Sequence, residues 1–182
     1  FSSSLNSAGY LFINNRGLVR RPNFEPFTLV MVNSLSNLIN YLIFLPILLL
    51  ILFLYGRHPT SSLTLLPLLI LIQSLMIMGL SSIIATLNVF YHDVQYLTSV
   101  ALLILFYLTP IFYQSQTAGE RYSFVFKLNP IAVLIESYRT IFFYGIFLGW
   151  GSILYAGIAS LAVCGIGYFV YSRQLSNVID AI

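Results

Sequence analysis

The sequence predicts an all-α membrane protein, a polytopic transmembrane helical bundle with a re-entrant or interfacial helix region before its last span. Hydrophobic residues make up 59% of the chain and charged residues only 7%, whereas about a quarter of the residues of a soluble domain are charged. The charged residues are also separated by intervals long enough for a helix of about 20 residues to cross a bilayer. These apolar runs are continuous and lack the alternation of barrel strands, so helices are the expected structure.

Two segments are expected to precede the first complete span. Residues 1–13 have the pattern of the end of an earlier span, because no basic stretch comes before their apolar residues as it would in a signal peptide. We therefore expect the sequence to be an N-terminally truncated fragment of a single membrane domain. Residues 14–26 form the most polar and basic stretch, and this composition alone is also typical of a loop near anionic headgroups.

Four intervals without Asp, Glu, Lys or Arg predict the membrane spans. The predicted spans are residues 27–55, 63–87, 96–113 and 150–171. Pro46, Pro67 and Gly79 fall inside them and indicate bends, since a membrane helix can satisfy its freed backbone groups through neighbouring helices. Positive residues are divided equally between the two sides that four spans create, so charge bias does not decide the orientation.

The segment of residues 114–149 is too polar and too often interrupted by charge to be a plain span. Within it, Asn129 and Pro130 predict a helix start, because Asn can cap a helix and Pro lacks only an N–H that the first helical position does not need. Glu136 and Arg139 are spaced to pair on one face of that helix. We expect an amphipathic helix at an interface, where ionisable groups usually line a protein or water cavity.

No catalytic arrangement is visible in the sequence. The two histidines and five carboxylates are scattered, without the spacing of metal ligands or of a nucleophile and its base. No glycine-rich phosphate-binding loop occurs, so any energy from ATP must come from another chain. Cys164 lies in an apolar run, which indicates packing. We expect no cofactor or metal on this chain, and the slight charge of +3 indicates no nucleic-acid partner.

An ordered set of motifs resembles the permease of type-2 ABC exporters, and the resemblance covers essentially the whole chain. The motifs are a basic element at residues 16–24, the stretch NVFYHDV at residues 88–94, PIFY at residues 110–113, and LNPI at residues 128–131. The chain is most similar to the branch that exports polysaccharides such as O-antigen, capsule and teichoic acid. It departs from the family pattern at His92, where Arg is usual, and at Phe24-Glu25-Pro26, where the family has a Phe-Pro pair.

The resemblance implies a permease subunit in the cell inner (cytoplasmic) membrane that moves a polysaccharide or glycolipid. Its implied partners are a second copy of the permease in a homodimer, the lipid bilayer, the glycan substrate, and a separate ABC ATPase that binds ATP and Mg²⁺. The residues implied to contact the ATPase are Arg16, Leu18, Arg20, Arg21 and Phe24. A second cytoplasmic loop would hold Asn88, His92 and Asp93. The extracellular exit region would contain Pro110, Tyr113, Asn129, Pro130, Glu136 and Arg139.

Two stripes at helical spacing predict particular helix faces. The first consists of Asn33, Asn37, Asn40 and Tyr41, and it predicts either part of the translocation path or a hydrogen-bonded seam between helices. The second consists of Ser152, Ala156, Ser160 and Cys164, small residues that would let another helix approach closely.

Two other functions remain open. A drug or lipid exporter of the same fold would line its path with plain aliphatic side chains, whereas stacked aromatic and amide side chains suit sugars. A membrane enzyme acting on lipid-linked sugars would need carboxylates or histidines gathered at one membrane face. The identity and length of the exported molecule are not determined by the sequence.

Overall fold

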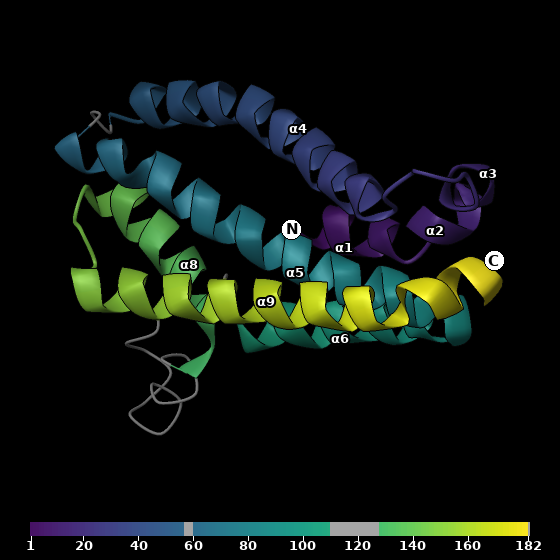
Figure 1. Cartoon of the computed structure of the whole chain (residues 1–182). Helices are drawn as coiled ribbons and strands as arrows, with labels where there is room; N and C mark the ends of the chain where they lie inside the picture. Colours follow the sequence, from purple (N-terminus) through teal and green to yellow (C-terminus); the bar gives the residue numbers. More distant parts are fainter. Residues whose placement is uncertain (57–59, 110–127, 182) are drawn as a thin grey trace. The chain divides into compact units, whose positions relative to one another are not determined.

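The computed structural model describes residues 1–56, 60–109 and 128–181, and within these ranges the chain is helical without a strand. The elements are α1 (Ser2–Ala8), α2 (Leu11–Asn14), α3 (Arg16–Val19), α4 (Phe27–Leu54), a 3₁₀ helix (Ser61–Leu65), α5 (Leu66–Phe90), α6 (Val94–Leu108), α8 (Pro130–Arg139), a π-helical turn (Thr140–Tyr144) and α9 (Trp150–Ala181), as Figure 1 shows. The predicted all-α class is therefore confirmed.

Three described helices are long and apolar enough to cross a membrane, and they correspond to predicted spans. They are Phe27–Leu54, Ser62–Phe90 and Trp150–Ala181. The fourth apolar helix, α6, has 15 residues, fewer than the roughly 20 that cross a bilayer. The C-terminal part of its predicted span lies outside the described residues.

Several helix boundaries differ from the sequence expectation, for example α5 ends at Phe90 and not at residue 87. Helix α9 continues through Arg173 to Ala181, beyond the predicted end at residue 171. Arg173 ends the apolar run but does not end the helix, because arginine at an exposed position is a good helix former. Pro67 lies in the first turn of α5, where a missing N–H costs no hydrogen bond. It therefore helps to start α5, directly after the 3₁₀ helix Ser61–Leu65, and the bend predicted there stays a prediction.

The described chain forms two compact units. Unit 1 consists of Phe1–Asn40, Ser74–Leu102 and Leu161–Ile182, and unit 2 consists of Tyr41–Gln73 and Leu103–Ser160. The core of unit 1 is formed by Phe12, Val19, Val30, Ala85, Val89, Tyr171 and Val178. Buried apolar residues of unit 2 include Leu52, Leu69, Ile72, Leu134, Ile141 and Ile153.

Close approach of α5 and α9 explains two glycines of unit 1. A Cβ at Gly79 would lie 2.6 Å from the backbone nitrogen of Cys164 and 2.6 Å from the carbonyl carbon of Val163. A Cβ at Gly167 would lie 2.6 Å from the hydroxyl oxygen of Ser82. Both distances are too short for real side chains, so glycine at these positions permits helix packing with little space between the backbones.

The predicted small-residue stripe is only partly buried. In unit 2, Ala156 is 1% exposed and Ser160 is fully buried, while Ser152 is intermediate. In unit 1, Cys164 is also intermediate, although its backbone lies against Gly79. The close approach of α5 and α9 is thus made at Gly79 and Gly167. Neither glycine belongs to the stripe that the four-residue spacing predicted.

Candidate functional site

The basic element of unit 1, residues 16–24, is called the basic turn below. It exposes its charged side chains and buries one apolar side chain. In α3 and the residues that follow it, Arg16, Arg20 and Arg21 are exposed, whereas Val19 is 1% exposed. Leu18 is half-buried. The guanidinium groups therefore remain available to a partner while Val19 fixes the turn to the core of unit 1.

Past this turn the backbone reverses toward α4. Asn23 has a φ of 67°, a left-handed conformation that Asn adopts more readily than most residues. Phe24 is half-buried, and Pro26 is fully buried immediately before α4. Of the five residues implied to contact an ATPase, the structure thus brings three arginines and two partly exposed apolar residues together on one short segment.

Tyr171 of α9 joins the end of this segment to the start of α4. Its hydroxyl donates a hydrogen bond to Oε1 of Glu25 at 2.6 Å and accepts one from the backbone N–H of Phe27 at 3.1 Å. The Tyr171 ring packs against Phe12 and Phe27, with ring centroids 6.2 and 5.5 Å apart. Sequence reasoning missed this contact, because nothing in the sequence pairs residues 146 positions apart.

Asn88 does not belong to the loop between α5 and α6, where the sequence analysis had placed it. It lies inside α5 and is 1% exposed, so only His92 and Asp93 belong to the exposed connection. The Asn88 side chain donates to the backbone oxygen of Gly9 at 2.8 Å and accepts from the N–H of Gln95 at 3.1 Å. These hydrogen bonds therefore connect the turn between α1 and α2 (the α1–α2 corner) with the turn between α5 and α6 (the α5–α6 corner).

Gln95 adds a second hydrogen bond between the same two corners. Its side-chain amide donates to the backbone oxygen of Asn6 at 2.8 Å. The hydroxyl of Ser99, one turn later on α6, donates to Oδ1 of Asn6 at 3.2 Å. A residue at position 9 must be small here, because a methyl group on Gly9 would overlap the Gln95 side chain. The segment that carries the basic turn is thus fixed to α5 and α6.

Asn33 and Asn37 form a seam between α4 and α1. The Asn33 side chain donates to the backbone oxygen of Ser4 at 3.0 Å and accepts from the hydroxyl of Ser7 at 2.8 Å. Oδ1 of Asn37 accepts from the hydroxyl of Ser3 at 2.8 Å. Of the two interpretations of the asparagine stripe, the contacts of these two residues favour the helix seam.

The remaining two members of that stripe do not take part in the seam. Asn40 is exposed. Tyr41 belongs to unit 2, where its ring packs edge-on against Tyr138 at 6.4 Å, and Tyr138 in turn stacks on Phe142 at 6.2 Å with an interplanar angle of 11°. Of the four residues, Asn33 and Asn37 therefore form the polar seam, Tyr41 joins an aromatic row, and Asn40 belongs to neither.

The start of α8 in unit 2 follows the sequence prediction. Oδ1 of Asn129 accepts hydrogen bonds from the backbone N–H groups of Ile131 and Ala132, at 3.0 and 3.4 Å, and Pro130 is the first helical residue. The cap satisfies two N–H groups that have no partner within the helix. Pro110 and Tyr113, the other predicted members of the exit region, lie outside the described residues.

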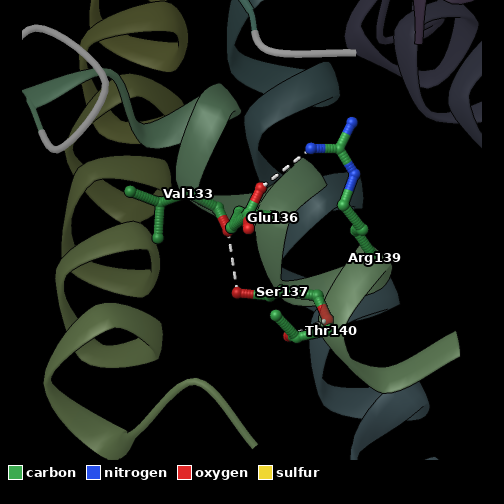
Figure 2. A network of polar contacts seen from close by, with 5 residues as sticks. All are labelled: Val133, Glu136, Ser137, Arg139 and Thr140. Carbon is green, nitrogen blue, oxygen red and sulfur yellow. Dashed lines mark hydrogen bonds and ion pairs between the residues drawn. The ribbon is translucent and has the colours of Figure 1, made fainter. Parts of the chain in front are cut away.

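Glu136 and Arg139 form an ion pair on α8. The Arg139 guanidinium lies 3.3 Å from Oε2 of Glu136, and the two side chains are 18% and 23% exposed respectively. Figure 2 shows the two charged groups directed toward one another, beside the hydrogen bond from the Ser137 hydroxyl to the backbone oxygen of Val133. Pairs at this spacing stabilise a helix by only about 0.2–0.5 kcal/mol, so helix stability alone does not explain two charges there.

The turn after α8 contacts the connection that precedes α5. A π-helical turn ends at Gly145, whose φ of 65° favours glycine. The backbone oxygen of Gly145 accepts a hydrogen bond from the hydroxyl of Ser62 at 2.7 Å. Gly145 follows a helical pattern, so the sequence could have indicated it as a helix end. The sequence could not have indicated Ser62 as its hydrogen-bond partner.

Among the described residues, no group of three or more His, Cys, Asp or Glu side chains is arranged to hold a metal ion.

Comparison with known proteins identifies the relatives of this chain. A model of the family described as ABC-2 type transporter matches residues 1–143. Two proteins of Klebsiella pneumoniae, each named O-antigen export system permease protein RfbA, are 30% and 31% identical to it over 171 residues. A Myxococcus xanthus protein of the same name is 31% identical over 145 residues. The matches cover 93% of this chain and 66% of each Klebsiella protein, and 79% of this chain and 56% of the Myxococcus protein.

Proposed function

This chain belongs to the ABC-2 type transporter family, and we propose on that premise that it is the membrane-spanning permease subunit of an ABC exporter. The molecule it moves across the cytoplasmic membrane is a polysaccharide or a glycolipid, a choice that rests on its three relatives named O-antigen export system permease. In this proposal the permease makes and breaks no bonds. ATP and Mg²⁺ bind to a separate ABC ATPase, and the permease acts as a homodimer in the inner membrane.

The observation that carries the proposal is the combination of exposed charge and rigid anchoring in the basic turn of unit 1. Arg16, Arg20 and Arg21 are exposed, while Val19 is buried in the core. Charges at the rim of an interface steer encounter and set register, and the side chains that become fully desolvated at its centre supply most of the binding energy. Leu18 is well placed for the second role. A turn anchored in this way can transmit a displacement to the membrane helices, which a free loop could not do.

The two units separate the segments that we propose to lie on opposite sides of the membrane. Unit 1 contains the basic turn, the exposed residues His92 and Asp93, and the end of α9. Unit 2 contains α8 and the turn at Gly145. All segments proposed to be cytoplasmic therefore belong to one unit, and all described segments proposed to be extracellular belong to the other.

The aromatic row of unit 2 supports a sugar substrate over a plain lipid or drug. Tyr41 contacts Tyr138, and Tyr138 contacts Phe142. Aromatic rings present a stacking face, although the Tyr138 hydroxyl is itself buried. The Glu136–Arg139 pair lies on the same helix as Tyr138. We place this row and this ion pair beside the exit of the translocation path.

The test is reconstitution of the permease with its ABC ATPase in proteoliposomes. A lipid-linked polysaccharide is supplied on the side that carries the ATPase, and its arrival on the other side is followed with a glycan-specific lectin. The expected result is movement that requires ATP and stops with an ATPase that cannot hydrolyse it. Movement of phospholipid or a hydrophobic drug in place of the glycan would contradict the substrate assignment, and movement of glycan without any ATPase would contradict the exporter assignment.

A further inference from the structure

Tyr171 occupies a place that belongs to neither the basic turn nor the exit region. It lies on α9, is 1% exposed, and forms hydrogen bonds with two residues that flank the start of α4, Glu25 and Phe27. The first N–H groups of a helix have no partner within it and are usually satisfied by a side chain just before the helix. Here the acceptor of the Phe27 N–H comes from the other end of the chain.

The charge of Glu25 strengthens this contact. A carboxylate near the N-terminus of a helix is favoured by the helix dipole, and hydrogen bonds to ionised acceptors are shorter and stronger than neutral ones. The 2.6 Å distance between the Tyr171 hydroxyl and Oε1 of Glu25 fits that class. Glu25 itself is exposed and directly follows Phe24, the last residue of the basic element. The hydrogen bond therefore links a surface residue that directly follows the turn with a buried residue of α9.

Ring packing fixes the position of the Tyr171 hydroxyl. The ring contacts Phe12 and Phe27, and it belongs to the same buried core as Val19 and Val178. Protein cores are closely packed, so a displacement of one member is passed to its neighbours. A movement of the basic turn would reach α9 by two routes, through the apolar contact at Val19 and through the hydrogen bond at Glu25.

We propose that Tyr171 is a positioning residue of transport, which ties the basic turn to α4 and α9 so that the docked ATPase moves both helices together. The inference rests on the proposed function, since it takes the basic turn to be the ATPase contact. The hydroxyl acts through Glu25 and the Phe27 N–H and touches neither ATP nor the transported glycan. Its removal uncouples the helices from the turn while leaving the docking surface intact.

The test compares Tyr171→Phe with three other variants in the reconstituted permease–ATPase complex. Tyr171→Phe keeps the ring in the core and removes only the hydroxyl. The control is Tyr168→Phe, an exposed tyrosine whose ring also packs against Phe27 and Tyr171. Glu25→Ala removes the acceptor from the surface without disturbing the core, and Glu25→Gln keeps a carbonyl oxygen that can still accept from Tyr171.

The measured quantity is glycan exported per ATP hydrolysed, together with the amount of ATPase bound. For Tyr171→Phe and Glu25→Ala, ATPase binding stays at the level of the unaltered complex and export per ATP falls about fivefold or more, the lower end of typical coupling between two sites. Tyr168→Phe and Glu25→Gln keep the original ratio.

Three outcomes would overturn the inference. The first is an unchanged export ratio in Tyr171→Phe and Glu25→Ala, and the second is an equal fall in Tyr168→Phe. The third is a loss of folded protein or of ATPase binding in Glu25→Ala, because a structural role would then account for the effect. If the unaltered permease fails to bind the ATPase, the proposed function itself is wrong and this inference falls with it.

Discussion

The side-chain amide of Asn88 donates a hydrogen bond to the backbone oxygen of Gly9, 79 residues earlier in the chain, at a distance of 2.8 Å. The same side chain accepts from the N–H of Gln95, so one buried amide joins the segment before the basic turn to both helices of the α5–α6 corner. The basic turn is held by hydrogen bonds to its neighbours on both sides, at Gly9 before it and at Glu25 after it.

Asn88→Ala is expected to lower the stability of unit 1. The substitution leaves the oxygen of Gly9 and the N–H of Gln95 without their partner, and a buried polar group that loses its partner costs about 1–3 kcal/mol. Thermal unfolding of the purified permease in detergent measures the change. Asn40→Ala is the matched control, since Asn40 is exposed on α4. Equal midpoints for the two variants would refute the structural role of Asn88.

Much of the fold was predictable from the sequence, but the contacts that hold the basic turn were less so. Intervals without charge predicted the long helices because a bilayer excludes charged residues. They gave no information on Asn88, which was placed in a loop because it begins the motif NVFYHDV that also contains His92 and Asp93. Its partners Gly9 and Gln95 come from tertiary packing, and a polar residue inside an apolar run does not reveal which chain segment will satisfy it.

Gly79→Ala is expected to disturb the packing of α5 against α9. The added methyl group would lie 2.6 Å from the backbone of Val163 and Cys164, and backbone atoms cannot move aside as a flexible side chain can. Overpacking of this kind costs about 1–3 kcal/mol. Gly165→Ala on α9 is the control, because no neighbouring atom lies within 4 Å of its Cβ. We predict a lower unfolding midpoint for Gly79→Ala only, and an unchanged midpoint would contradict the close approach.

Asn129→Ala is expected to loosen the first turn of α8. Loss of an N-cap side chain costs about 0.5–2 kcal/mol, and here two N–H groups lose their acceptor. Amide hydrogen exchange at residues 131 and 132 should accelerate, while exchange in α9 stays constant. Asn129→Asp keeps a side-chain oxygen at the cap and should preserve protection. Acceleration in both variants would show that the cap is not the cause.

A cysteine at position 136 tests the proposed orientation. In a Cys164→Ala background, Glu136→Cys should react with a membrane-impermeant thiol reagent added to intact cells, because α8 is proposed to lie on the extracellular side. Asp93→Cys, in the exposed connection between α5 and α6, should react only after the membrane is opened. The reverse pattern would invert the topology.

Contacts of the residues proposed for the exit region were partly predictable, because some of them are local in the sequence. Asn129 and Pro130 are adjacent, and Glu136 and Arg139 lie one turn apart, so the helix start and the ion pair follow from local spacing. The contact between Ser62 and Gly145 joins segments 83 residues apart. The division of Asn33 and Asn37 from Tyr41 likewise depends on α1 and α8, which periodicity within α4 cannot reveal.

The most direct test of the central claim, that the basic turn of this permease docks a separate ATPase, measures ATPase co-purification and ATP-driven export for Leu18→Asp. The variant places a charge among the partly buried apolar residues of the turn, and Asn14→Asp adds the same charge at an exposed position of α2, outside the turn. We predict that the Leu18→Asp permease inserts and forms dimers but fails to couple ATP hydrolysis to export, whereas Asn14→Asp behaves as the unaltered protein. Replacing Arg16, Arg20 and Arg21 with Gln should weaken complex formation in a salt-sensitive way. If Leu18→Asp leaves both ATPase association and export intact, the docking assignment is wrong, and the segment is only a loop on the membrane surface.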